Sequence, residues 1–149
     1  NLVQAVVAAG DRANQRVSRG ATYICVAGPR LGTQAESHWL RQMGGDLVGM
    51  TNVPEVFLAR EAQMAYATLG MVTDYDCWLA DESQHVSAMG IFELYGQTLT
   101  QARAVLDSLL ASDLPEPEAA IRQALSHAVL TPPEAMTPEQ HQWFDVLKR

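Results

Sequence analysis

The stretch from Gly49 to Trp78 constrains the fold of this chain most, because it reads as a strand, a helix and a second strand in quick succession. The short apolar run 47–50 ends abruptly in two polar residues, as a buried strand does where it leaves a sheet. Pro54 can open the helix, because the first helical turn does not use the N–H that proline lacks. Apolar positions between 56 and 65 supply a buried helix face, and residues 68–72 read as a second buried strand.

Two acidic residues follow this second strand. Successive side chains of an extended chain point to opposite faces, so Asp74 and Asp76 should share one side and Tyr75 the other. Open parallel sheets bind ligands at the carboxyl ends of their strands, where Met50 and Thr51 also fall. Without further information, however, the two aspartates are as readily turn residues, Thr51 a capping residue and Met50 a core residue.

The preceding part of the chain shows the same alternation of helices and strands. Apolar residues that recur every three to four positions predict a helix over 2–18, closed by Gly20, and β-branched and aromatic residues predict a strand over 22–27. Thr33 is a candidate N-cap for a helix that runs to about Met43. This order predicts an α/β fold, which we expect to be part of a three-layer sandwich with a mixed, mainly parallel central sheet.

The alternation stops after Trp78. A polar loop is expected over 79–86, followed by a long helix over 88–109 with Ser87 as its cap. Prolines then break the chain, a further helix is predicted over 121–128, and Thr137 begins a capping-box pattern before a last helix. We therefore expect one domain over 1–111 and C-terminal helices over 112–149.

Composition narrows the possible partners. The formal charge of −7 argues against nucleic acid or an anionic membrane surface as the main partner. No apolar run approaches the roughly twenty residues of a membrane helix, and no signal peptide is visible, so a cytoplasmic location is expected. Cys25 and Cys77 lack both metal-ligand spacing and a disulfide framework, which indicates free thiols and no metal site.

Three motifs give the chain a family resemblance. They are Gly28-Pro29-Arg30 followed by Ala35-Glu36-Ser37, Gly49 to Glu55 followed by Ala59-Arg60-Glu61-Ala62, and Thr73 to Trp78. Together they resemble the 5'-methylthioadenosine phosphorylases, in the trimeric branch of the purine nucleoside phosphorylases. The likeness covers about residues 1–110, in order, and corresponds to the second half of that family.

The resemblance implies a pentosyltransferase that cleaves 5'-methylthioadenosine with phosphate, to adenine and 5-methylthioribose 1-phosphate. By its place in the motif, Asp74 resembles the residue that protonates or hydrogen-bonds purine N7 as negative charge develops on the leaving base. Asp76 resembles its partner, which accepts a hydrogen bond from the amino group of adenine. An aspartate fits a 6-aminopurine at this place, because an acceptor pairs with N–H donors and repels a carbonyl.

The same resemblance supplies the other substrate-binding residues. Thr51 corresponds to a hydroxyl that touches phosphate, and Met50 packs against sugar and base. Leu31 stands where the family usually has phenylalanine on the purine face. Thr73 also falls in the binding motif, whereas Glu36 reads as a structural hydrogen-bonding residue. Three apolar residues would wall the 5' substituent, although they equally form an ordinary helix stripe: Ala88, Ile91 and Phe92.

The family pattern also sets expectations for the assembly. It implies inorganic phosphate as co-substrate, no other cofactor, and a homotrimer of complete subunits. In the family, the Gly-rich loop and the arginine that hold phosphate lie in an N-terminal half, so we expect this chain to be inactive without such a half. The alternatives are a phosphorylase for methylthioinosine or adenosine, and a non-catalytic chain that binds purine nucleosides.

Overall fold

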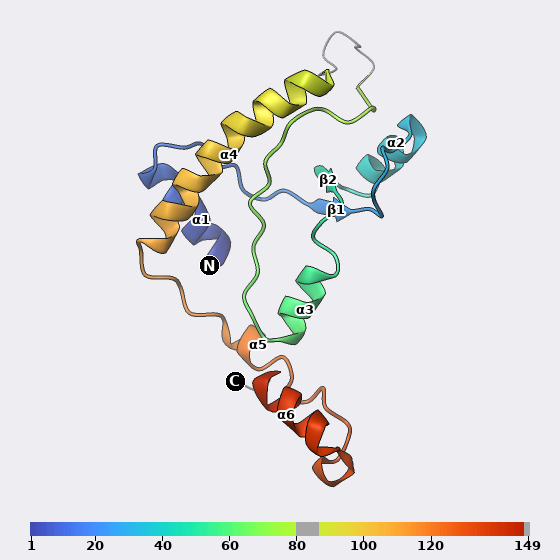
Figure 1. Cartoon of the computed structure of the whole chain (residues 1–149), viewed down its shortest axis with the longest axis vertical. Coiled ribbons are helices and arrows are strands. Elements are labelled where there is room, and N and C mark those ends of the chain that lie inside the picture. The colour runs from blue at the N-terminus through green and yellow to red at the C-terminus, as the bar shows by residue number, and fades with distance from the viewer. Residues whose placement is uncertain (80–86, 148–149) are drawn as a thin grey trace.

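The computed structural model describes residues 1–79 and 87–147, except for the side chain of Ala88. Helices and short parallel strands alternate over the first half of the chain, which makes the fold α/β (Figure 1). The elements are α1 (Leu2–Arg12), β1 (Tyr23–Cys25), α2 (Gln34–Gln42), β2 (Leu47–Gly49), α3 (Glu55–Glu61), α4 (Ala88–Leu110), α5 (Ala119–Arg122), the 3-10 helix η2 (Pro133–Ala135) and α6 (Pro138–Leu147).

The two strands form a parallel pair. Tyr23 lies opposite Leu47, and Cys25 lies opposite Gly49. Gly49 allows the Tyr23 ring to cross the end of β2, since a side chain at position 49 would collide with the phenol oxygen. Both strands fall where the sequence predicts them, although each is shorter than predicted. Their parallel pairing brings the ends of β1 and β2 to the same edge.

The main apolar core lies between α1 and α4, which Figure 1 shows side by side. Ala9 from α1 packs against Val105 and Leu109 from α4, and all three are buried. Arg12 adds hydrogen bonds from its Nη2 to the carbonyl of Ser108, at 3.2 Å, and to the hydroxyl of Ser112, at 3.0 Å. This core joins the start of the chain to a helix that begins some ninety residues later.

The predicted helix over 2–18 is wrong at its end, because α1 stops at Arg12. Asn14 adopts a positive φ of 53°, and the amide of Gln15 donates to the carbonyl of Gly10 at 2.8 Å. The chain then folds back, and a Cβ atom at Gly10 would lie 2.5 Å from the Cγ2 of Val17. Val17 therefore continues the apolar pattern of the sequence although it lies beyond the end of α1, because the chain folds back and packs it against the helix.

The second predicted strand, over 68–72, is also wrong, because this segment is extended but joins no ladder within the described residues. This segment and β2 line the same groove, and no ladder of hydrogen bonds joins them in the described part of the chain. A side-chain hydrogen bond of 2.8 Å, from the Asn52 amide to the Thr68 hydroxyl, ties its start to the segment after β2. The extended geometry was predictable, but the strand needs a partner to become part of a sheet.

The C-terminal helices follow the prediction in part. The Ser87 hydroxyl accepts from the amide of Gly90 at the start of α4, and Thr137 and Gln140 form the expected reciprocal bonds at the start of α6. The predicted loop over 79–86 lies outside the described residues from 80 onward. None of the helices that the structure describes is long and apolar enough to cross a membrane.

The helix predicted over 121–128 is wrong in extent, since α5 covers only Ala119–Arg122 and turns follow it. The amide of Leu125 donates to the side-chain oxygen of Gln63, at 3.2 Å, in place of the carbonyl one helical turn earlier. The Gln63 amide group in turn donates to the carbonyl of Leu147 at 2.7 Å. Gln63, which is buried, thus connects the end of α3 to both parts of the C-terminal segment.

Candidate active site

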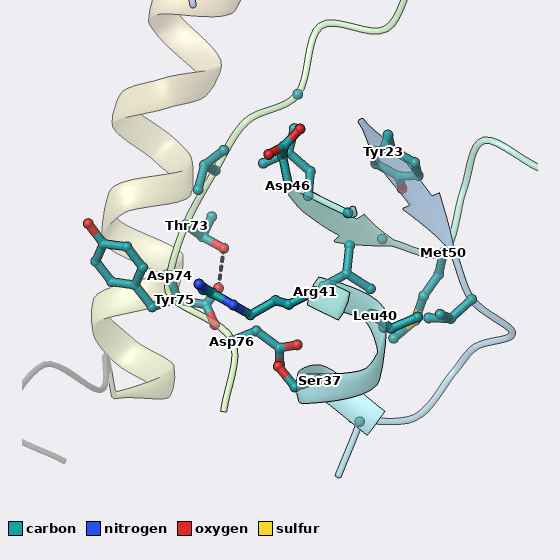
Figure 2. A pocket seen from close by; sticks show the side chains of 18 of the residues that line it. Tyr23, Ser37, Leu40, Arg41, Asp46, Met50, Thr73, Asp74, Tyr75 and Asp76 are labelled. Carbon is teal, nitrogen blue, oxygen red and sulfur yellow. Dashed lines mark hydrogen bonds between the residues drawn. The ribbon is translucent and has the colours of Figure 1, made fainter. Parts of the chain in front are cut away.

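A groove of about 950 Å³ lies between the β2 and α2 side of the molecule and the extended segment 68–78. Figure 2 shows side chains from α2, from the end of β2 and from the segment facing it. Six of the predicted site residues line this groove: Leu31, Met50, Thr51, Thr73, Asp74 and Asp76. The structure therefore brings together three motifs that are spread over more than forty positions of the sequence.

One wall of the groove is the chain that leaves β2. Met50 follows Gly49 directly, and its sulfur lies over Gly28, where a Cβ atom would be only 2.7 Å from the Sδ. Gly28 therefore permits the close approach of the loop after β1 to the residue after β2. Leu31, on that loop, exposes 92% of its surface, so it is open to contact with a ligand.

An ion pair holds this loop against α2. Arg30 donates from Nη1 and Nη2 to the two carboxylate oxygens of Glu36, at 2.8 and 2.6 Å. Glu36 also accepts from the amide of Thr33, whose hydroxyl caps the helix in return. The hydrogen bonds from Arg30, and then from the Thr33 backbone, lower the pKa of Glu36 to about 2. The structural role predicted for Glu36 is confirmed.

The two aspartates lie on the opposite wall. The hydroxyl of Thr73 donates to Oδ1 of Asp74 at 2.8 Å, and the backbone amide of Cys77 donates to Oδ1 of Asp76 at 2.9 Å. Among the described residues, neither Oδ2 atom accepts a hydrogen bond. Figure 2 shows Tyr75 directed away from the side that carries both carboxylates, as the alternation of an extended chain predicts. Each carboxylate thus has one oxygen fixed and one available.

Helix α2 contributes two groove residues that sequence reasoning missed. The Arg41 guanidinium lies 3.6 Å from the centre of the Trp78 ring, and Ser37 stands one turn earlier on the same helix face. Ser37 is buried, with 2% of its surface exposed. The i, i+4 spacing of a serine and an arginine next to a motif glutamate is the signal that could have identified them.

Cys77 directly follows Asp76, at the end of the segment that carries both aspartates. Its thiol points to the carbonyl of Gly32, with 3.9 Å between sulfur and oxygen. Burial is the main cause that raises the pKa of the Cys77 thiol, and the charge of Asp76 adds to it. Cys25 and Cys77 are free thiols, and no three metal-binding side chains converge within residues 1–79 and 87–147.

The predicted wall for the 5' substituent is not part of this groove as described. Ile91 and Phe92 lie in the first turns of α4 and are absent from the groove lining, and Phe92 exposes 73% of its surface. The side chain of Ala88 lies outside the described part of the chain. The assignment of these three residues to a substrate pocket stays a prediction.

Comparison with known families and curated proteins gives a consistent result. The family model of the phosphorylase superfamily matches residues 1–112. The S-methyl-5'-thioadenosine phosphorylase of Rhodospirillum rubrum is 41% identical over 124 residues, which are 80% of this chain and 42% of that protein. The enzyme of the same name from Bradyrhizobium diazoefficiens is 40% identical over 138 residues, 90% of this chain and 47% of the relative. The chain thus spans about half the length of the curated relatives it matches.

Solved structures agree with this match. A methylthioadenosine phosphorylase from an Antarctic soil metagenomic library superposes with a TM-score of 0.76 at 39% identity, over 97% of this chain and 51% of that chain. A methylthioadenosine phosphorylase from Schistosoma mansoni, solved in complex with adenine, gives a TM-score of 0.66 at 31% identity, over 74% of this chain and 44% of that one. The groove described above therefore lies in a fold shared with these proteins.

Proposed function

The chain belongs to the phosphorylase superfamily, and from that premise we propose that it carries the purine- and sugar-binding part of a 5'-methylthioadenosine phosphorylase. The observation that supports this proposal best is the meeting of Met50, Thr51, Asp74 and Asp76 in one groove. These residues come from two separate motifs, and each keeps a polar or apolar group available to a ligand. The names of the relatives supply the substrate class.

In the proposed reaction, an oxygen of inorganic phosphate forms a bond to C1' of the nucleoside while the bond from C1' to purine N9 breaks. The electron pair of the broken bond goes to the purine, which must gain a proton to leave as neutral adenine. Asp74 acts as the acid or hydrogen-bonding partner at N7, and Asp76 accepts a hydrogen bond from the amino group. The available Oδ2 atoms are the ones that would meet the base.

The other groove residues have positioning roles in this proposal. Met50 packs against the sugar and base, and Leu31 covers the purine face without aromatic stacking, which lowers base affinity by about 1 kcal/mol relative to an aromatic residue. The Thr51 hydroxyl contacts phosphate. Thr73 orients Asp74 through the hydrogen bond between their side chains, and so belongs to the binding set.

Further features of the complete protein belong to the same proposal. We place these residues in a three-layer α/β sandwich with a mixed, mainly parallel sheet, with a domain over 1–111 and a helical tail over 112–149. The active assembly would be a cytoplasmic homotrimer that uses phosphate as co-substrate and no other cofactor. Phosphate would be held mainly by residues outside this chain.

One observation favours a second candidate, a chain that binds purine nucleosides without phosphorolysis. Among the described groove residues the cations are Arg30 and Arg41, and the first is paired with Glu36 while the second lies on Trp78. Binding a dianionic phosphate needs hydrogen-bond donors that are not already engaged. Holding phosphate and nucleoside together lowers the reaction barrier by several kcal/mol, of the order of 7 or more in well-oriented systems, and a chain without a phosphate site loses this contribution.

Release of adenine from 5'-methylthioadenosine, with and without phosphate, separates the two candidates. We expect phosphate-dependent release by the complete protein and none by a sample verified by mass spectrometry as the 149-residue chain alone. Phosphate-independent binding with no turnover by the complete protein would favour the second candidate. Comparison with methylthioinosine and adenosine as substrates identifies the base and the 5' group that are preferred.

The 5' group has its own test in the apolar residues at the start of α4. Ala88→His should weaken use of methylthioadenosine more than use of adenosine, because imidazole fills apolar space and can hydrogen-bond a 5'-hydroxyl. Burial of a methylthio group corresponds to about 1–2 kcal/mol, so the preference should change roughly tenfold. Ile121→Ala, in α5, is the control and should leave the ratio of the two specificity constants unchanged. A constant ratio in Ala88→His would make these residues part of an ordinary helix stripe.

A further inference from the structure

Ser37 carries a buried hydroxyl that makes a weak interaction with the thiol of Cys77. Its residue surface is 2% exposed, and within the described residues its hydroxyl oxygen is the buried side-chain atom that forms no hydrogen bond of normal geometry. A buried hydroxyl without a partner costs about 1–3 kcal/mol relative to one that is satisfied. An apolar residue of the same size would avoid that cost, so we expect the hydroxyl to form a hydrogen bond when the groove holds its ligand.

The hydroxyl lies at the groove, beside the acidic segment. Ser37 lines the groove together with Asp76, and Figure 2 shows one side chain on α2 and the other on the segment that faces it. Burial is the main cause that raises the pKa of the Cys77 thiol; the charge of Asp76 raises this pKa further, and a hydrogen bond with the Ser37 hydroxyl lowers it. The serine and the aspartate therefore both lie near the same thiol.

Helix α2 is held in place for such a contact. Leu40, three residues after Ser37, is 9% exposed, and Arg41, four residues after it, lies 3.6 Å from the centre of the Trp78 ring. The contact of Arg41 holds the helix face that carries Ser37 against Trp78. The Oδ1 atom of Asp76 already accepts from the amide of Cys77. The Oδ2 atom has two lone pairs, so it can accept from the serine O–H and from the amino group of the base at the same time.

We propose that Ser37 is a positioning residue for Asp76. When the groove holds a purine, the Ser37 hydroxyl donates a hydrogen bond to the Asp76 carboxylate. This bond sets the preference of the site for a purine with an amino group over one with an oxo group. A carboxylate that receives two donors stays an acceptor toward the ligand, and an acceptor binds the amino group of adenine but repels the carbonyl of hypoxanthine. This inference rests on the proposed function, because it assigns the second aspartate to the base.

The test is the ratio of the dissociation constants for adenine and hypoxanthine, measured by titration calorimetry on the complete protein and its variants. Ser37→Ala should reduce the preference for adenine about tenfold or more, the usual effect of losing one hydrogen bond to a charged group. Ser37→Thr keeps the hydroxyl and should stay within about twofold of the wild type. Should Ser37→Ala fail to fold, Ser37→Cys keeps the volume with a much weaker donor and should lower the ratio in the same way.

Ser112→Ala is the matched control, because it removes a hydroxyl that bonds Arg12 and the Leu109 carbonyl, far from the groove. It should lower the melting temperature and leave the base ratio unchanged. A wild-type protein without preference for adenine would overturn the proposed function itself. A wild-type preference that Ser37→Ala leaves intact, or that Ser37→Thr loses equally, would overturn the role of Ser37 and leave the proposed function standing.

Discussion

The guanidinium of Arg41 stacks on the ring of Trp78, with 3.6 Å between the guanidinium carbon and the ring centre. Trp78 also meets Tyr75 edge to face, with their ring centres 6.1 Å apart. Through this pair of contacts α2 holds the segment that carries Asp74 and Asp76, although no ladder joins that segment to β2 in the described part of the chain. The contacts among a cation and two aromatic rings thus hold this segment in place, as hydrogen bonds between strands would in a continuous sheet.

Replacement of Arg41 tests this account of how the segment is held. Arg41→Gln keeps most of the length of the side chain and removes the charge, so it should lower the free energy of unfolding by up to about 1 kcal/mol. We also expect weaker adenine binding, because the two aspartates would lose their fixed position. Denaturant titration and calorimetry provide the two measurements. Arg103→Gln, on the exposed face of α4, is the control and should change neither quantity.

The ion pair of Arg30 and Glu36 predicts a dependence of stability on pH. Because the pKa of Glu36 is lowered to about 2 in the folded chain, its contribution is complete above the unfolded value of 4.5 and is lost as the pH falls from there through about 2. Glu36→Gln should therefore reduce the difference in unfolding free energy between pH 6 and pH 3. Glu93→Gln, an exposed residue of α4, serves as the comparison. An unchanged difference in Glu36→Gln would show that the pair does not stabilise the fold.

Gln63 predicts how the C-terminal segment is attached. Gln63→Met keeps the length of the side chain but removes its hydrogen bonds to the Leu147 carbonyl and the Leu125 amide. Loss of two part-buried hydrogen bonds should cost about 1–3 kcal/mol and expose residues 112–132 to proteolysis. Gln101→Met, on the exposed side of α4, should be cleaved at the wild-type rate. Equal cleavage of both variants would mean that Gln63 does not anchor the tail.

Local signals were predictable from the sequence. The Thr33 cap, the Ser87 cap and the reciprocal bonds of Thr137 and Gln140 all depend on residues within a few positions of each other. The apolar run before Met50 also gave a strand in the right place. The aspartates were predicted to lie near Met50 and Thr51 at the ends of two parallel strands; all four residues line one groove, although residues 68–72 pair with no strand in the described part of the chain.

Contacts between distant residues were not predictable in this way. The apolar pattern continues to Val17 because this residue packs onto Gly10 after α1 has ended. The periodicity alone does not distinguish such a fold-back from a longer helix. Residues 68–72 have the composition of a strand, but pairing depends on what lies beside them. The roles of Ser37 and Arg41 depend on the docking of α2 against residues 76–78, which the sequence does not display.

Asp74→Asn in the complete protein tests the central claim most directly, with specificity constants measured for methylthioadenosine and methylthioinosine. The amide loses the acid that serves adenine and adds a donor for the 6-carbonyl, and a mismatched polar group costs about 1–3 kcal/mol once a bound base covers it. Our account predicts a shift in preference toward the oxopurine of about tenfold or more. Asp46→Asn, in the groove but away from the motif, should leave the preference unchanged. An unaltered ratio in Asp74→Asn, with turnover retained, would contradict the assignment of Asp74 as the residue that reads the base.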